Sequence, residues 1–209
     1  MSLNPQHIHI AKSGFERKCI FVFIDAYHSL ILENTLSSSW KENKITKELV
    51  KYFKNSSYFS KWGLDIVREY YLDEYYEETD PDKTPRIDIK ITNNQIQKKF
   101  DYFIEAKNLC ETDWKKETGT KVSAKNLQQR YIDTGISHFV SGYYPSNGCL
   151  CGYILQGNTD NIIHKINEIL EKKSLNCLEL TNPINNHRLI YNYKRDTEVL
   201  INLFFELIK

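Results

Sequence analysis

Apolar and polar residues alternate between positions 86 and 91, where three isoleucines flank Asp88 and Lys90. A period of two is typical of a β-strand with unlike faces. Asn93 and Asn94 follow, and asparagine is a common turn residue. The sequence therefore predicts a strand that a turn joins to the next apolar segment.

The second strand of this predicted hairpin runs from Phe100 to Lys107 and ends in a Glu-Ala-Lys triplet. Side chains alternate across a strand, so Glu105 and Lys107 are expected to share one face. Asp88 on the neighbouring strand could face them. The hairpin would then bring two carboxylates and one ammonium group together where the two strands meet.

The other apolar patterns predict the remaining elements. Residues 1–12 have no such pattern and are expected to be irregular. Helices are predicted at 15–36, 40–53, 122–134, 159–173 and 197–208, and further strands at 64–72, 148–155 and 187–194. The polar segment 108–120 is expected to form a loop at the mouth of the site. A mixed central sheet flanked by helices would bury both faces of these strands, which indicates an α/β fold.

The hairpin resembles the PD-(D/E)xK nuclease superfamily, which includes many restriction and repair endonucleases. Asp88 matches the first acidic position of that motif, Glu105 the second and Lys107 the lysine, while the proline is displaced to Pro85. Glu-x-Lys occurs four times in the chain, and only this triplet ends a strand-like run that follows an aspartate-bearing strand. The resemblance covers about residues 40–155. It implies a restriction-endonuclease-like fold in a single nuclease domain, residues 1–209.

The resemblance also implies a metal-dependent reaction. Asp88 and Glu105 would be ligands of Mg²⁺, with Mn²⁺ as a substitute, and the Ala106 carbonyl would complete the set. Mg²⁺ prefers oxygen ligands, acidifies a bound water and screens phosphoryl charge. Lys107 would position or deprotonate the water, or stabilise the transition state as a point charge.

An early helix of the superfamily often supplies another carboxylate, and Glu42 is the first candidate for this role. Glu48 on the same predicted helix and Glu69 on the following strand remain open as alternatives. A glutamate on an amphipathic helix is also commonly just solvated.

Substrate-binding candidates lie after the triplet. Lys115 and Lys116 would contact phosphates from the loop, and Lys125 from the following helix. Gln128 and Tyr131 resemble the Gln or Tyr motif that the superfamily places on this helix. For Lys125, Gln128 and Tyr131, a helix that only packs against the core is an equal alternative.

The segment 139–144, Phe-Val-Ser-Gly-Tyr-Tyr, also resembles a pattern in restriction-like and phage-defence nucleases. His138 stands where such proteins tend to carry an arginine. It would either contact phosphate when protonated or pack as a neutral ring.

Composition narrows the picture. The 209 residues are 41% hydrophobic with a net charge of +1, so there is no global basic field for nucleic acid. Charge is nevertheless uneven, with eight acidic and one basic residue in 65–82, and eleven basic and six acidic residues in 83–130. Five cysteines and no signal-like segment indicate a reducing cytoplasm, and no apolar run is long enough to cross a membrane. Cys149-Leu-Cys151 is interpreted as alternation in a buried strand.

The leading hypothesis is a Mg²⁺-dependent endonuclease, with DNA as the favoured substrate, in restriction or phage defence. The alternative is a catalytically inactive binding or assembly subunit of this fold in a multi-protein nucleic-acid complex. A homodimer and partner proteins of a defence system are both open. A small-molecule enzyme is a weaker hypothesis, because the chain has no Gly-rich phosphate loop and no Ser-His-Asp pattern.

Overall fold

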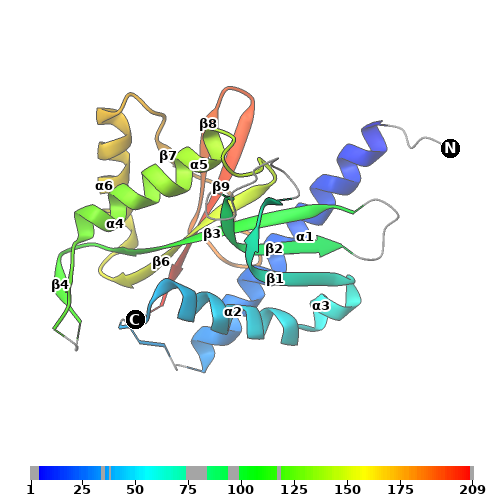
Figure 1. Ribbon diagram of the computed structural model, residues 1–209, viewed down its shortest axis with the longest axis horizontal. Helices are drawn as coiled ribbons and strands as arrows, with labels where there is room; N and C mark the ends of the chain where they lie inside the picture. The colour runs from blue at the N-terminus through cyan, green and yellow to red at the C-terminus, as the bar shows by residue number, and fades with distance from the viewer. Residues whose placement is uncertain are drawn as a thin grey trace.

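A mixed β-sheet with helices on both faces forms the centre of the protein (Figure 1). The computed structural model describes residues 5–33, 36–37, 39–73, 84–93, 99–116 and 119–207. Its seven strands are β1 (Leu64–Tyr71), β2 (Arg86–Asn93), β3 (Asp101–Cys110), β6 (Gly148–Gln156), β7 (Leu178–Leu180), β8 (Ile190–Arg195) and β9 (Glu198–Glu206). The helices are α1 (Pro5–Leu32), α2 (Glu42–Asn55), α3 (Ser57–Lys61), α4 (Ala124–Tyr131), α5 (Ser137–Val140) and α6 (Thr159–Lys172).

Two smaller features complete the described elements. A π-helical segment, Ile132–Ile136, joins α4 to α5. The short strands β4 (Trp114–Lys115) and β5 (Lys121–Val122) pair outside the main sheet. β4 lies inside the segment 108–120 that was expected to be a loop, and β5 follows that segment directly. Asn94, the second predicted turn residue, and residues 74–82, the second half of the acidic stretch 65–82, lie outside the described residues.

The order of strands in the sheet is β1-β2-β3-β6-β9-β8-β7. β3, β6 and β9 are parallel neighbours, whereas the other pairs are antiparallel. This arrangement confirms the predicted α/β class with a mixed central sheet flanked by helices. It also confirms that residues 86–107 form a hairpin, because β2 and β3 pair antiparallel.

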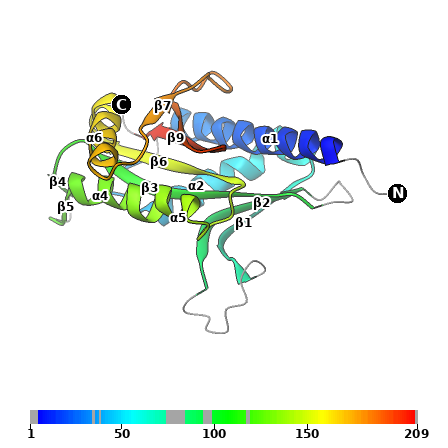
Figure 2. The ribbon, with the colours of Figure 1, turned by 90° about the horizontal axis from the view of Figure 1, so that it is seen from above.

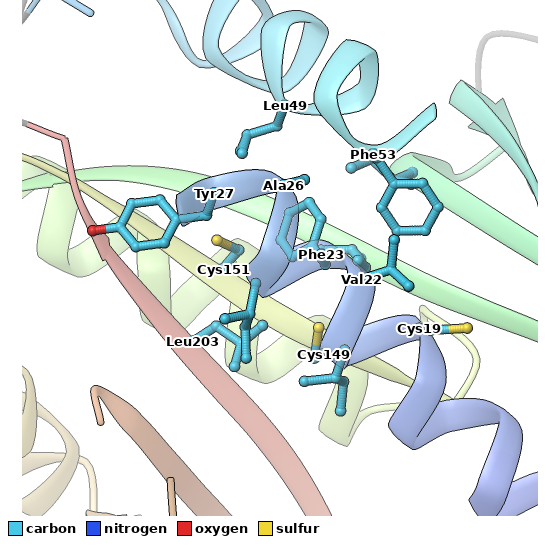
Figure 3. Close-up of a cluster of buried hydrophobic side chains, with 14 of the residues drawn as sticks. Cys19, Val22, Phe23, Ala26, Tyr27, Leu49, Phe53, Cys149, Cys151 and Leu203 are labelled. Carbon is cyan, nitrogen blue, oxygen red and sulfur yellow. The ribbon is translucent and has the colours of Figure 1, made fainter. Parts of the chain in front are cut away.

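Each face of the sheet has its own apolar core. α1 and α2 pack on one face, where the ring of Tyr27 stacks on Phe205 of β9 with centroids 4.1 Å apart. Figure 3 shows this layer, in which α1 lies over β6 and β9 and contributes residues that include Cys19, Val22, Phe23 and Ala26. Cys149 and Cys151 are buried free thiols of β6 in the same layer, as the alternation predicted. On the other face, α4, α5 and α6 pack against β3, β6 and β9.

The N-terminal prediction was wrong, because α1 begins at Pro5 rather than near residue 15. Residues 6–14 are mostly exposed, so they carry no apolar stripe that could have indicated a helix. Proline suits the first turn of a helix, where its missing N–H would have no partner. The buried part of α1 starts at Phe15, where the apolar pattern starts.

The C-terminal prediction was also wrong, because residues 198–206 form strand β9 and not a helix. A continuous apolar run fits a buried strand as well as a buried helix. β9 lies between β6 and β8 inside the sheet, which explains its burial. The turn before it is a two-residue hairpin loop, since Arg195 pairs with Glu198, and Asp196 there has φ of 52°. Aspartate tolerates this left-handed conformation better than most residues.

β1 and β2 bend together away from the sheet. Arg68 pairs with Ile89 and Tyr70 pairs with Ile87, but Glu69 between them has φ of 51°. Beyond this point Ile87 belongs to the core of the α4–α6 face, although Ile89 belongs to the core of the α1–α2 face. Figure 2 shows the ends of β1 and β2 projecting from the body of the sheet.

Among the described helices, none combines the length and apolar character needed to span a membrane.

A substitution at Gly148 would test how closely β3 and β6 approach each other. A Cβ at this position would lie 2.5 Å from the Phe103 carbonyl oxygen and 2.8 Å from Phe139 Cε1. We expect Gly148→Ala to lower the free energy of unfolding by about 1–3 kcal/mol, as overpacking does. The control is Gly14→Ala in α1, where a Cβ would meet nothing within 4 Å, and which should raise stability by about 0.5–1 kcal/mol. Urea unfolding measures both, and equal effects would contradict the packing argument.

Candidate functional site

The candidate site lies where β2 leaves β3. Pairing between the two strands extends only to Ile89 opposite Ile104. Past that point, the N–H of Ala106 donates to Asp88 Oδ2 at 2.8 Å. The N–H of Asn108 donates to Glu42 Oε2 at 2.9 Å. Backbone N–H groups inside a protein need a hydrogen-bond acceptor. Along this edge of β3, where β2 no longer pairs, two carboxylates accept from the N–H groups in place of a neighbouring strand.

Glu105 and Lys107 share one face of β3, as the alternation predicted. Their side chains form a buried ion pair, with Lys107 Nζ donating to Glu105 Oε1, and the two residues are only 5% and 6% exposed. The other carboxylate oxygen, Glu105 Oε2, accepts from the backbone N–H of Asp88 at 3.2 Å. Asp88, Glu105 and Lys107 are therefore brought together in the structure.

Burial and mutual repulsion make both carboxylates of the hairpin harder to ionise. Burial raises the pKa of Asp88 to about 6, with the charge of Glu42 adding to the rise, against the stabilising N–H of Ala106. Burial and then the charge of Asp88 raise the pKa of Glu105 above its usual range, although Lys107 opposes this rise. One ammonium group does not neutralise the three carboxylates that influence one another here.

The third carboxylate of the site is Glu42, the first of the three candidates for an additional acidic residue. Glu42, at the first turn of α2, acts on the pKa of both Asp88 and Glu105. Glu48 instead forms an ion pair with Lys51 at 2.7 Å. Glu69 lies at the bend of β1, where its Oε1 accepts from Asn43 Nδ2 at 2.9 Å, next to Glu42 in sequence.

Tyr144, in the segment after α5, lies beside the Glu105–Lys107 ion pair. This residue was not identified as part of the site from the sequence. This buried tyrosine donates its hydroxyl to the Arg86 carbonyl at 3.3 Å. Burial, followed by the charges of Glu105 and Asp88, raises the pKa of Tyr144. A tyrosine pair in a turn gives no sequence signal for contact with a strand more than fifty residues earlier.

His138, on α5, lies beside Tyr144. Its ring centroid is 5.1 Å from that of Tyr144, and burial, followed by the charge of Lys107, lowers its pKa. His138 Nδ1 is buried and has no hydrogen-bond partner within the described residues. Of the two interpretations of this residue, the structure favours a packed, neutral ring.

Two of the predicted substrate-binding residues lie in the core. Gln128 is buried, and its Nε2 donates to the Cys110 carbonyl at the end of β3 at 3.1 Å. Tyr131 is buried as well, with its hydroxyl 2.9 Å from Asn202 Oδ1 of β9. In these positions neither side chain can touch a substrate, so the packing interpretation of α4 holds for both.

The three predicted lysine contacts remain on the surface side of the fold. Lys125 is exposed on the first turn of α4, and Lys115 is exposed on β4. Lys116 donates to the Ser39 carbonyl at 3.2 Å, which ties the β4–β5 hairpin to the segment just before α2. That contact places Lys116 on the side of the protein from which Glu42 reaches the site.

The donor chemistry fits a hard divalent cation, which prefers carboxylate oxygens. Asp88 Oδ1 and Glu42 Oε1 accept no hydrogen bond from the described residues, whereas both oxygens of Glu105 are engaged. Nowhere in the described ranges is a group of three or more His, Cys, Asp or Glu side chains arranged to hold a metal ion. The site carries negative charge that would attract a cation, but Glu105, one of its three carboxylates, is held by Lys107.

Comparison of the chain with protein-family models, with curated proteins and with solved structures gave no match.

The raised pKa of Asp88 predicts a pH-dependent stability. Because its pKa is about 6 in the folded protein and near 3.8 without these surroundings, the folded state binds the proton more tightly, and stability falls as pH rises between about 4 and 6. Asp88→Asn keeps an oxygen for the Ala106 N–H and removes the charge. We expect its stability, relative to the unaltered protein, to improve by up to about 3 kcal/mol between pH 4 and 7.

Urea unfolding in the presence of a chelator measures this difference at each pH. The control is Asp196→Asn, in the exposed β8–β9 turn, where asparagine accepts the positive φ equally well. This control should follow the unaltered protein. A constant difference between Asp88→Asn and the unaltered protein over the whole pH range would contradict the electrostatic account.

Proposed function

We propose that the protein is a metal-dependent endonuclease that hydrolyses phosphodiester bonds, with DNA as the favoured substrate and restriction or phage defence as its setting. The observation that carries this proposal is the convergence of Asp88, Glu105 and Lys107 where β2 and β3 separate. Raised pKa values of both carboxylates support it, because perturbed ionisable groups cluster at functional sites. The resemblance of the hairpin to the PD-(D/E)xK motif adds the reaction class.

A restriction-endonuclease-like fold is part of the same proposal. It is supported by an antiparallel hairpin that carries the acidic residues and by a parallel strand, β6, next to the strand of the triplet. An early helix, α2, which comes before α3 and β1 in the chain, supplies Glu42 to the site. Since one fold serves many activities, the site carries the functional argument and the fold only accompanies it.

Each residue has a distinct role in this proposal. Asp88 and Glu105 would hold Mg²⁺ or Mn²⁺, and Glu42 would add negative charge from α2. When bound, such a cation supplies an acidic water and positive charge for the phosphoryl oxygens. Lys107 Nζ would donate hydrogen bonds to a phosphate oxygen or to the attacking water, as a compact point charge. The exposed Lys115 and Lys125 and the half-buried Lys116 would contact the nucleic-acid backbone without reading its sequence.

One observation favours the second candidate, an inactive binding or assembly subunit. Glu105 and Lys107 are 5% and 6% exposed and bind each other. A nuclease must free both groups for metal and water, whereas an assembly subunit can keep them as a structural ion pair. The two candidates therefore differ in whether this pair opens.

Cleavage of plasmid DNA and of labelled DNA and RNA oligonucleotides with Mg²⁺ or Mn²⁺ tests the proposal. We expect Asp88→Asn and Lys107→Met to reduce the cleavage rate by about 10²- to 10⁴-fold, the range of a positioned acid–base group. The matched control is Lys173→Met, since Glu171-Lys-Lys173 is another Glu-x-Lys triplet, at the exposed end of α6. Full activity in both site variants would refute the mechanism. Binding without cleavage by the unaltered protein would favour the assembly subunit.

Metal binding has a readout that does not depend on cleavage. A ligand that binds only the folded state stabilises it, by about 2.7 kcal/mol at a hundred times its Kd. We expect Mn²⁺ to raise the Tm of the unaltered protein and of Glu48→Gln, but not of Asp88→Asn. Glu48 pairs with Lys51 elsewhere on α2, so it controls for loss of a nearby carboxylate. An equal rise in Asp88→Asn would show that the cation binds at another place.

A further inference from the structure

We propose that Tyr143, backed by His138, is a base-stacking shelf beside the site, and that the strand to be cut is presented there as unpaired, single-stranded nucleic acid. The substrate named here rests on the proposed nuclease function. The shelf itself is argued from the aromatic side chains at the end of α5 and from the burial of the residues beneath them.

The shelf combines an exposed ring with a fixed support. Tyr143 is 41% exposed. Its ring centroid lies 4.3 Å from that of His138, at an interplanar angle of 47°, and 5.4 Å from that of Tyr144. Tyr144 is buried and packs edge-on against Phe139, at 5.3 Å. An exposed aromatic ring that packs against a half-buried histidine and a buried tyrosine can stack on a base of any identity, because every base has a π-face.

The shelf is attached to the catalytic hairpin. The hydroxyl of Tyr144 donates to the carbonyl of Arg86, two residues before Asp88 on β2. Arg86 is exposed and lies close enough to Asp88 to oppose the rise in its pKa. His138 in turn lies near enough to Lys107 for the ammonium charge to lower its pKa. A base on Tyr143 would thus place its own phosphate close to Arg86 and the acidic cluster, and arginine is well suited to binding phosphate.

The shape of the site favours an unpaired strand. Glu105 and Lys107 are buried, and Tyr144 and His138 lie close to them, so a substrate phosphate has to reach an ion pair that these two rings help to cover. In a duplex the base faces are stacked on one another and closed to Tyr143. Extruding a paired nucleotide costs a few kcal/mol, and this cost is smallest for a strand that is already single. Stacking and access therefore favour the same substrate.

Binding without cleavage separates the shelf from the reaction. We would measure fluorescence anisotropy of a labelled oligothymidylate, and of a duplex of equal length, with the full chain and a chelator present. We expect the single strand to bind more tightly than the duplex. Tyr143→Ala should weaken single-strand binding by about 5- to 150-fold, the effect of removing one stacked base. Tyr143→Phe and Tyr143→Trp should retain it, because they keep the aromatic ring.

The control variant is Tyr52→Ala, on α2, which covers the opposite face of the sheet and bonds to Glu33. It should leave binding unchanged, and thermal unfolding should show that all variants are folded. Quenching of a 2-aminopurine base by the unaltered protein, lost in Tyr143→Ala, would support stacking directly. Equal binding by Tyr143→Ala and the unaltered protein, or tighter binding of the duplex, would overturn the proposal.

The two proposals fail in different ways. Tyr143-dependent single-strand binding without any cleavage would support the shelf and remove the nuclease. Cleavage that depends on Lys107 but proceeds equally on duplex DNA and in Tyr143→Ala would support the nuclease and remove the shelf.

Discussion

The unpaired edge of β3 is the constraint on which the site depends. Once β2 has turned away, the N–H groups of Ala106 and Asn108 need acceptors that are not strands. Asp88 and Glu42 supply them, and this backbone requirement holds two carboxylates beside Glu105. Burial at this edge, together with the charge of Glu42, raises the pKa of Asp88, although the hydrogen bond from the Ala106 N–H opposes the rise. Structure and chemistry are therefore linked at this edge, since the hydrogen bonds that complete the sheet also concentrate the negative charge.

The bend that leaves this edge unpaired requires a strained backbone at Glu69, and the burial of apolar side chains beyond the bend offsets the strain. A non-glycine residue in the left-handed region, as at Glu69, costs roughly 1–2 kcal/mol. Past the bend, Ile87 is buried in the core beneath α4–α6, and Tyr70 packs against that core. Full burial of one such side chain contributes about 1.5–3 kcal/mol, enough to offset the strain. The hydroxyl of Tyr144 then joins the bent arm to the α5 turn.

The sequence could predict the parts of the site that are local in the chain. Glu105 and Lys107 share a face because strand alternation is local, and Asp88 follows from the hairpin. Glu42 was only one of three alternatives, because the approach of α2 to β3 depends on tertiary packing. Tyr144 was missed for the same reason, since a turn residue gives no signal of its contacts. For Gln128 and Tyr131 the sequence left substrate contact and packing equally open, because an amphipathic pattern does not say which polar groups face a substrate and which satisfy the core. β9 was assigned to the wrong class because a long apolar run fits either kind of buried element.

The remaining question for the site is what neutralises it. Asp88, Glu105 and Glu42 would carry three negative charges if all were ionised, and Lys107 supplies one positive charge. A buried excess of negative charge is unfavourable, so it must take up protons or a cation. The raised pKa values describe the first response. A divalent cation would be the second, and it would compete with Lys107 for the oxygens of Glu105. In an assembly subunit, protons and the closed ion pair are sufficient, so the same residues are compatible with either function. What distinguishes them is whether substrate and cation together favour the open pair over the buried one.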